Sequence, residues 1–567
     1  MTETRKAGIA AISSAILYRL TQGKTLNGSF YFSLGYFSIT LLSLLPYTWS
    51  DYCYVDELTL MVDSKRMLLG DQQYRDYLTH YGMGSVYLIA LVWRITGIVS
   101  HIPIRLLTFL AITLGGWLLI LIARYFTGRH WLSLLPAIVF ANFHSHLFPF
   151  INHHWFASLV SILYLFLVVR YLHSLCLKDL YYCGLAAGLS LLFIMHEGVV
   201  NIFVGILIVI IVALLIGERL DNCRLSKLAT TYFAGLLTLL LPVFIYYIAT
   251  GAFDDYLENV FIWSLTKYLT PGANNNIPWA DINNLHLWRS EPSRMVMFFT
   301  TCSVLLLLLL PLIVLLMAVV LLTSPSSIDK HFRFTPTVEL AKRLTGAGVV
   351  VEQRYYYLVM LVLTLYAIGL YLTPVLSQAS FYKLLWGSLP ALILAVIFWE
   401  RGLTAVTAIP GIRRALAAVM IFIFISLGIV TVARLSRVLE GNNRELYFDD
   451  ESTNFSNHPI IELINRETTP DDYFFAYKRL ALLFYMVETR LATRYTFNDG
   501  GVENTLTQAQ LKELVNDLYR QRPKFMVFSG EAELLELVQG NSDFPQWLNN
   551  NYFLRLKIEG LLLYQRK

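Results

Sequence analysis

The stretch GVVNIFVGILIVIIVALLIG at residues 198–217 contains no charged side chain. A helix that crosses the bilayer core, about 30 Å thick, needs roughly 20 consecutive apolar residues, so this stretch predicts a transmembrane helix. Similar apolar runs occur at about 30–48, 104–123, 131–149, 156–173, 180–196, 229–250, 296–322, 355–373, 384–400 and 415–435. Together they predict an α-helical polytopic membrane protein with about eleven transmembrane helices.

The composition agrees with this fold class. Of 567 residues, 56% are hydrophobic and only 15% are charged, and the mean hydropathy is +0.55. Because a soluble domain is roughly one quarter charged, so few charges cannot cover a water-facing surface of this size. The composition therefore excludes a soluble enzyme, a nucleic-acid binder and a fibrous protein.

One further run, MGSVYLIALVWRITGIV at residues 83–99, decides the topology. Arg94 lies near its middle, and a charge at the centre of a membrane helix costs about 2.5–3.5 kcal/mol. We interpret the run as an amphipathic helix on the outer interface, with Trp93 and Tyr87 at the headgroup boundary. If it does not cross, the basic N-terminus and the basic loops of the later spans all share the cytoplasmic side, as the positive-inside rule favours.

This topology divides the chain into three parts: a cytoplasmic N-terminus (1–29), a transmembrane domain (30–435) with outer loops 49–103 and 251–295, and an outer C-terminal domain (436–567). In the last part, HPIIELINRE and TQAQLKELVNDLYRQ predict helices, whereas DDYFFAYK and KFMVFSG predict strands. The closing residues predict a helix and a hairpin. Alternating helices and strands indicate a small three-layer α/β domain.

The densest group of charges follows the first span, in YVDELTLMVDSKRMLLGD at residues 54–71. Asp56 and Glu57 are adjacent carboxylates at the start of a predicted short helix, 57–69. Acidic residues at a helix N-terminus are stabilised by the helix dipole, so simple capping is one interpretation. Charged side chains beside a membrane domain are also frequent functional residues.

This loop, the order of the spans and the C-terminal pattern resemble the GT-C glycosyltransferases. Within that superfamily, the chain is similar to the branch of protein O-mannosyltransferases and of the bacterial transferase that adds aminoarabinose to lipid A. The resemblance implies a membrane glycosyltransferase that uses a polyprenyl-phosphate-linked sugar on the outer face of the cell inner membrane, with a periplasmic C-terminal domain. It implies that Asp56 is the base or the carboxylate that orients the acceptor, and that Glu57 supports it.

The second outer loop, FHSHLFPFINHHWFA at residues 143–157, carries His144, His146, His153 and His154. Many members of the branch have an aspartate near the position of His153 or His154, so this sequence departs from the family pattern. Three interpretations stay open: the histidines cap the helices at the interface, contact the donor phosphate or the acceptor, or bind a metal such as zinc. Their spacing matches no standard zinc motif.

Two more groups are candidates for the same face. His196 and Glu197 stand where an apolar span meets the outer side, and Glu197 is either a second acid or a helix-end cap. In the aminoarabinose transferase the matching region supplies a lysine to the phosphate, a role that an acid here does not take over. Tyr382 and Lys383 lie in the turn PVLSQASFYKLL, where the family keeps phosphate contacts, although Lys383 also suits an interfacial anchor.

The main alternative function is a transporter or flippase for a lipid-linked saccharide. Such a protein is expected to show inverted repeats and broken, polar segments at mid-membrane, and neither is visible in this sequence. A non-catalytic scaffold would leave the outer carboxylates, histidines and Lys383 unexplained. The residues do not specify the sugar, the acceptor (lipid, glycan or protein) or the oligomeric state. They indicate no cofactor with certainty and leave a divalent metal open.

Overall fold

The computed structural model describes residues 26–49, 55–79, 81–144, 149–216, 222–266, 350–377, 386–405, 458–477, 483–495, 506–558 and 560–567, with isolated residues between 418 and 439. The predicted spans at 296–322 and most of 415–435 lie outside them.

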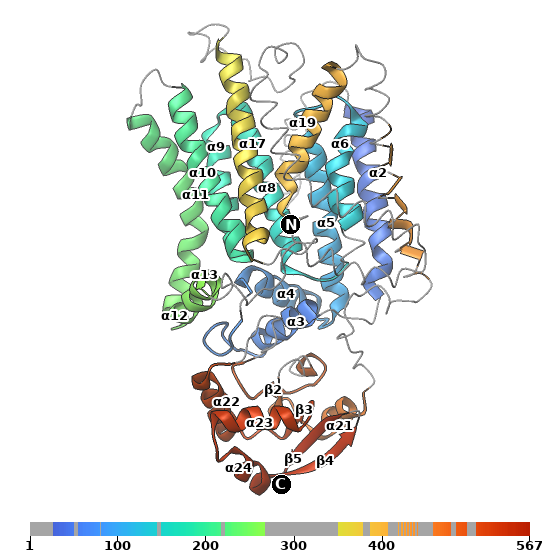
Figure 1. Cartoon of the computed structure of the whole chain (residues 1–567), viewed down its shortest axis with the longest axis vertical. Helices are drawn as coiled ribbons and strands as arrows, with labels where there is room; N and C mark the ends of the chain where they lie inside the picture. Colours follow the sequence, from blue (N-terminus) through green and yellow to red (C-terminus); the bar gives the residue numbers. More distant parts are fainter. Residues whose placement is uncertain are drawn as a thin grey trace, which may run out of the picture.

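Long helices form a bundle that makes up one end of the molecule (Figure 1). They are α2 (Leu26–Leu44), α5 (His101–Arg124), α6 (His130–Ala137) with its π-helical continuation η2 (Ile138–His144), α8 (His153–Ser174), α9 (Leu177–Phe193), α10 (Met195–Ile216), α11 (Asn222–Ala249), α17 (Val350–Ser377) and α19 (Leu389–Ala405). Nine of the predicted apolar runs lie on these helices.

Four of the described helical segments are long and apolar enough to cross a bilayer. They are His101–Arg124, His153–Ser174, Met195–Leu214 and Leu225–Ala249. The prediction of a helical membrane protein is confirmed at this level, whereas the number of about eleven spans stays a prediction. On α11, Leu237, Leu241 and Ile245 are exposed, as expected of side chains that face lipid.

The predicted first outer loop contains the two expected helices, α3 (Val55–Leu68) and α4 (Met83–Thr96), after the 3₁₀ turn η1 (Leu45–Trp49). Helix α4 is two-sided: Val86, Ile89 and Trp93 are buried, whereas Leu91 and Ile95 are exposed. This pattern fits the predicted amphipathic helix, and its place at a membrane interface stays a prediction.

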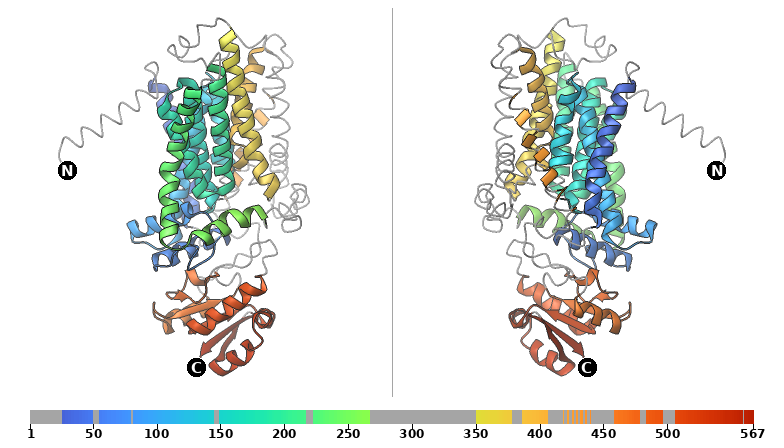
Figure 2. Two further views of the ribbon diagram at one scale, coloured as in Figure 1. Left: turned by 90° about the vertical axis from the view of Figure 1, so that its left-hand side faces the viewer. Right: turned by 90° about the vertical axis from the view of Figure 1, so that its right-hand side faces the viewer.

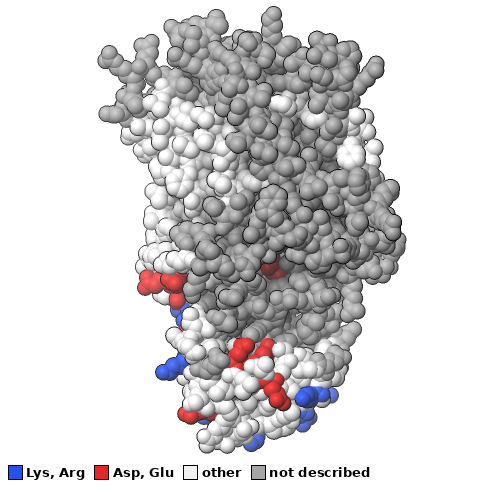
Figure 3. All heavy atoms as spheres, in the orientation of Figure 1, with Lys and Arg blue, Asp and Glu red and all other residues white. Residues whose placement is uncertain are grey.

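The short segments α12 (Phe253–Tyr256), η3 (Leu257–Ile262) and α13 (Trp263–Thr266) lie at the same end of the bundle as α3 and α4 (Figure 2). The C-terminal domain lies beyond them, so this end is called the domain end of the bundle below. On the face drawn in Figure 3, most of the described charged side chains lie over the C-terminal domain and its junction with the bundle.

The C-terminal domain contains α21 (Pro459–Glu467), β1 (Tyr473–Ala476), β2 (Arg490–Leu491), α22 (Gln508–Gln521), β3 (Phe525–Phe528), α23 (Glu531–Gly540), α24 (Phe544–Asn551), β4 (Tyr552–Ile558) and β5 (Leu561–Arg566). The strands form one sheet in the order β2-β1-β3-β5-β4. Strand β1 is parallel to β2 and β3, and β5 is antiparallel to β3 and β4. The predicted helices, strands and closing hairpin are all present, and β2 and α23 are additional.

The two faces of this sheet pack against different partners. Phe475, Met526 and Phe528 belong to a core with apolar residues of α22, α23 and α24. From the other face, Phe474 and Val527 belong to a core that includes α21 and continues into α3 and α4. The segment with α3 and α4 therefore completes the third layer of the C-terminal domain, although about 400 residues of sequence separate them.

Candidate active site

Asp56 is held by hydrogen bonds from two other segments at the domain end of the bundle. The Tyr81 hydroxyl donates to Asp56 Oδ1 at 3.1 Å, and the Asn152 amide nitrogen Nδ2 donates to Asp56 Oδ2 at 2.9 Å. Asp56 lies in the first turn of α3, Tyr81 shortly before α4, and Asn152 immediately before α8. Three segments that are distant in sequence thus converge on one carboxylate.

Glu57, the neighbour of Asp56, makes a different kind of contact. Both of its oxygens accept hydrogen bonds from Arg105, at 2.7 Å from Nε and 2.9 Å from Nη2. The side chains are almost fully buried, with 0% of Glu57 and 1% of Arg105 exposed. Arg105 Nη1 also donates to the Tyr47 carbonyl at 3.1 Å. The Glu57 charge is therefore compensated inside the protein, and the pair ties α3 to α5.

The first turn of α8 carries His153 and His154 next to this carboxylate. Asn152 is the N-cap residue of the helix, and its Oδ1 accepts a hydrogen bond from the His154 backbone N–H at 2.9 Å. The His153 ring lies 4.7 Å from the Tyr81 ring in an edge-on arrangement. The centroids of the two imidazoles are 4.2 Å apart.

Three histidines, His153 and His154 of α8 and His196 of α10, form what is called the histidine row here, and the row reaches the start of α19. The His154 ring stacks on the Trp386 indole, with centroids 4.2 Å apart and planes at 14°. The His196 ring, from the first turn of α10, lies 6.3 Å from the His154 ring. His153, His154 and His196 therefore form one group, and its member His153 contacts Tyr81, a hydrogen-bond partner of Asp56.

Glu197 lies deeper and contacts the interior of the bundle. Its Oε2 accepts a hydrogen bond from the Ser161 hydroxyl at 2.7 Å, and Asn201 Nδ2 donates to the same hydroxyl at 3.3 Å. Glu197 is 5% exposed. These contacts join α8 and α10, so Glu197 lies apart from the histidine row, and its predicted role in substrate binding stays a prediction.

Other candidates fall outside the described residues. These include His146, Tyr382 and Lys383, and the side chain of His144. Within the described part of the chain, no group of three or more His, Cys, Asp or Glu side chains is arranged to hold a metal ion. The divalent metal left open by the sequence stays untested.

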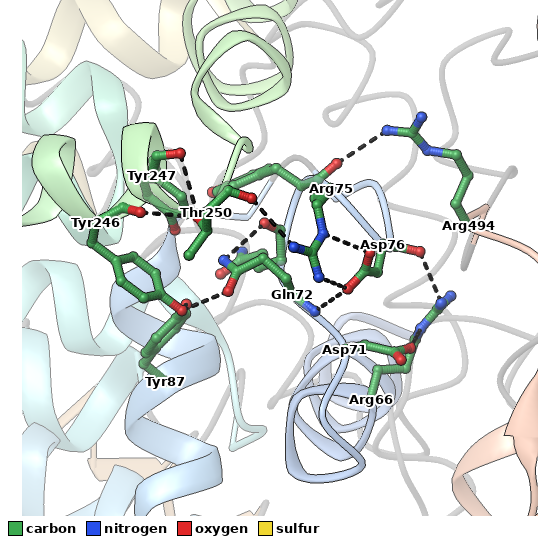
Figure 4. Close-up of polar contacts among 12 residues, drawn as sticks. Arg66, Asp71, Gln72, Arg75, Asp76, Tyr87, Tyr246, Tyr247, Thr250 and Arg494 are labelled. Atoms are coloured by element: carbon green, nitrogen blue, oxygen red, sulfur yellow. Dashed lines mark hydrogen bonds and ion pairs between the residues drawn. The ribbon is translucent and has the colours of Figure 1, made fainter.

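The segment that precedes Tyr81 contacts the C-terminal domain through Arg494, which is labelled in Figure 4. Arg494 Nη2 donates to the Tyr74 carbonyl at 3.1 Å and lies 3.2 Å from Asp255 Oδ2 of α12. Arg66 of α3 forms an ion pair with Asp71 at 2.7 Å. The Tyr74 hydroxyl donates to the Tyr81 carbonyl at 2.9 Å. The partner of Asp56 is therefore linked by these contacts to Arg494 of the C-terminal domain.

Two other ionisable side chains of α3, Asp63 and Lys65, have pKa values that burial shifts. Asp63 is fully buried, and this burial raises the pKa of its carboxyl to about 7, although Thr79 and the Arg66 charge partly oppose the shift. Lys65 donates hydrogen bonds to the carbonyls of Phe484, at 3.0 Å, and Tyr485, at 3.3 Å. Burial lowers the pKa of the Lys65 ammonium to about 8.

This chain is similar to known proteins in structure but not in sequence. No family model and no curated protein sequence matches the chain. Among solved structures, ArnT from Cupriavidus metallidurans in the apo state is similar over 93% of this chain and 96% of that chain, with 13% identity and a TM-score of 0.51. The same protein bound to undecaprenyl phosphate is similar over 93% of this chain and 97% of that chain, with 13% identity and a TM-score of 0.50. The chain therefore has the fold of ArnT, a GT-C protein.

A second GT-C protein, the oligosaccharyltransferase from Archaeoglobus fulgidus tethered with an acceptor peptide, aligns over 95% of this chain and 74% of that chain. Its identity is 12% and its TM-score 0.47. At these identities, the likeness to ArnT shows the fold and leaves the roles of individual residues to the geometry of this chain.

Sequence reasoning missed Tyr81, Asn152 and Trp386. Asn152 carried a usable signal, because an asparagine directly before an apolar helical run is a strong N-cap candidate. Tyr81 precedes Gly82 and the run that forms α4, a position that marks a helix start but no contact with Asp56. Trp386 lies in an apolar context without a local signal.

Proposed function

We propose that this chain is an integral-membrane glycosyltransferase. It moves a sugar from a polyprenyl-phosphate donor to a lipid, glycan or protein acceptor on the outer face of the inner membrane. The observation that carries the proposal is the Asp56 carboxylate, bonded to Tyr81 and Asn152 and next to the histidine row. A carboxylate within hydrogen-bond reach of an acceptor hydroxyl or amine is suited to act as its general base.

The histidine row supports a site for the donor phosphate. His153 and His154 lie in the first turn of α8, and His196 lies in the first turn of α10. Backbone N–H groups and the helix dipole make such N-termini favourable for anions, and imidazole N–H groups can donate to phosphate oxygens. ArnT, which has the same fold, was solved with undecaprenyl phosphate bound. Lys383 and Tyr382 stay candidates for further phosphate contacts.

In the proposed reaction, the acceptor oxygen or nitrogen attacks the anomeric carbon of the sugar and transfers its proton to Asp56. The bond between the anomeric carbon and the phosphate oxygen breaks, and the polyprenyl phosphate leaves with the bonding electrons. The leaving phosphate gains negative charge, which nearby hydrogen-bond donors stabilise. Glu57 contributes indirectly, because its ion pair with Arg105 fixes the first turn of α3.

The test is the Asp56→Asn variant in a transfer assay with a radiolabelled polyprenyl-phosphate sugar. Asparagine keeps the size and removes the basicity, so we expect transfer to fall by about 10²–10⁴ with thermal stability in detergent close to wild type. Asp254→Asn is the matched control, since Asp254 is an exposed carboxylate at the same end of the bundle. Near-wild-type transfer by Asp56→Asn would leave helix capping as the better account of this carboxylate.

A further inference from the structure

We propose that Asn152 is a positioning residue that sets both the orientation and the ionisation of the Asp56 carboxylate. Its catalytic consequence rests on the proposed function, whereas the bond between the two side chains does not. One amide group makes two contacts: Nδ2 donates to Asp56 Oδ2 at 2.9 Å, and Oδ1 accepts from the His154 backbone N–H at 2.9 Å.

These two contacts determine which way the amide points. A flipped amide would set its oxygen against the Asp56 carboxylate and its NH₂ group against the His154 N–H, and both contacts would be repulsive. Asn152 is 0% exposed, so water does not compensate for a lost partner. Because buried polar groups cost free energy when their hydrogen bonds are broken, the observed orientation is strongly favoured.

The arrangement gives Asn152 two separable roles. As the N-cap of α8, its oxygen holds the turn that carries His153 and His154. As a donor to Asp56, its nitrogen stabilises the charged carboxylate, because hydrogen bonds to the ionised form favour that form. Tyr81 donates to the other oxygen. Each carboxylate oxygen has two acceptor positions, so these two bonds orient the group and take one position on each oxygen.

The Asn152→Asp variant separates the two roles. Aspartate is as good an N-cap as asparagine, so the turn of α8 is retained, but the donor is replaced by a second carboxylate against Asp56. Two adjacent carboxylates resist ionising together. We expect lower thermal stability than wild type at pH 8, recovery at pH 5 when the pair holds a proton, and an acid limb of the pH–rate profile that moves to higher pH. The loss of a hydrogen bond to a charged group predicts a fall in kcat/KM of roughly 10- to 100-fold at pH 8.

The reciprocal variant Asp56→Asn/Asn152→Asp tests the bond independently of activity. It restores an amide–carboxylate pair with the partners exchanged. We expect stability at pH 8 to return close to wild type, and transfer to stay low because the carboxylate now projects from α8. If the double variant is no more stable at pH 8 than Asn152→Asp, the proposed bond is wrong.

Asn152→Ser covers the case in which Asn152→Asp does not fold, because serine also caps helices and carries no charge. It should fold, transfer sugar more slowly than wild type, and move the acid limb to higher pH, whereas an unchanged pH profile in this variant would overturn the proposal. The outcomes also separate the two claims. A stability rescue in the reciprocal variant, combined with no transfer by the wild-type protein, would keep the Asn152–Asp56 bond and reject the glycosyltransferase.

Discussion

Replacement of Glu57 by glutamine removes one charge from a buried ion pair and leaves the other in place. Arg105 is 1% exposed and binds both carboxylate oxygens, so its guanidinium would stay in the interior without a counter-charge. Breaking a buried pair from one side costs about 3–5 kcal/mol, because the remaining charge is uncompensated. Glutamine can still accept one of the two hydrogen bonds, so we expect a loss of about 3 kcal/mol in the free energy of unfolding.

The stability of Glu57→Gln is best compared with that of the double variant Glu57→Gln/Arg105→Met. Removing both charges also removes the desolvation cost, and such replacements are often neutral or stabilising. Unfolding in detergent should therefore give a large coupling between the two sites, with the double variant more stable than Glu57→Gln alone. Transfer by Glu57→Gln should be nearly normal at temperatures where the variant is folded. A fully stable Glu57→Gln protein without transfer activity would refute this reasoning and assign Glu57 to the chemistry.

Three further predictions concern the surroundings of the site. The pKa of Asp63 is raised from 3.8 to about 7 in the folded protein. Its contribution to the free energy of unfolding is therefore full below pH 4 and falls by up to about 4 kcal/mol as the pH rises through 7. Asp63→Asn should flatten this part of the stability–pH curve, and an unchanged curve would contradict the burial of this carboxyl. Arg494→Ala should speed amide hydrogen exchange at residues 71–78, since Arg494 joins Tyr74 to Asp255. The charge-matched variant Arg494→Lys should restore only part of the protection. Equal exchange in the wild type and both variants would show that this contact does not hold the segment. Reporter tags after Lys567 and within 254–294 should lie outside the cell and tags within 323–350 inside, and a cytoplasmic C-terminus would overturn the topology.

The sequence predicted the elements whose signals are local. Helices α3 and α22 and strand β3 follow their hydrophobic periodicity, and the long apolar runs became the bundle. Strand β2 consists of only Arg490 and Leu491, too short for a pattern, and it forms because β1 offers an open edge.

Only some residues of the candidate site, and not their contacts, could be predicted from the sequence. Asp56 and the histidines were conspicuous as polar groups beside apolar runs, but the contacts of Asp56 with Tyr81 and Asn152 depend on how three segments fold together. The Arg105 partner of Glu57 is 48 positions away and lies near the start of a predicted span, where a single arginine carries no signal of its target. The shared core between α3 and the C-terminal sheet was hidden for the same reason, since each half alone has an ordinary amphipathic pattern.

The most direct test is a reconstitution of the purified protein in proteoliposomes with a radiolabelled polyprenyl-phosphate sugar and a mixture of candidate acceptors. The account predicts that the wild-type protein transfers label to an acceptor and releases polyprenyl phosphate, and that Asp56→Asn, folded to the same extent, does not. Label that crosses the bilayer while still attached to its lipid, without any transfer, would instead identify a flippase and contradict the account.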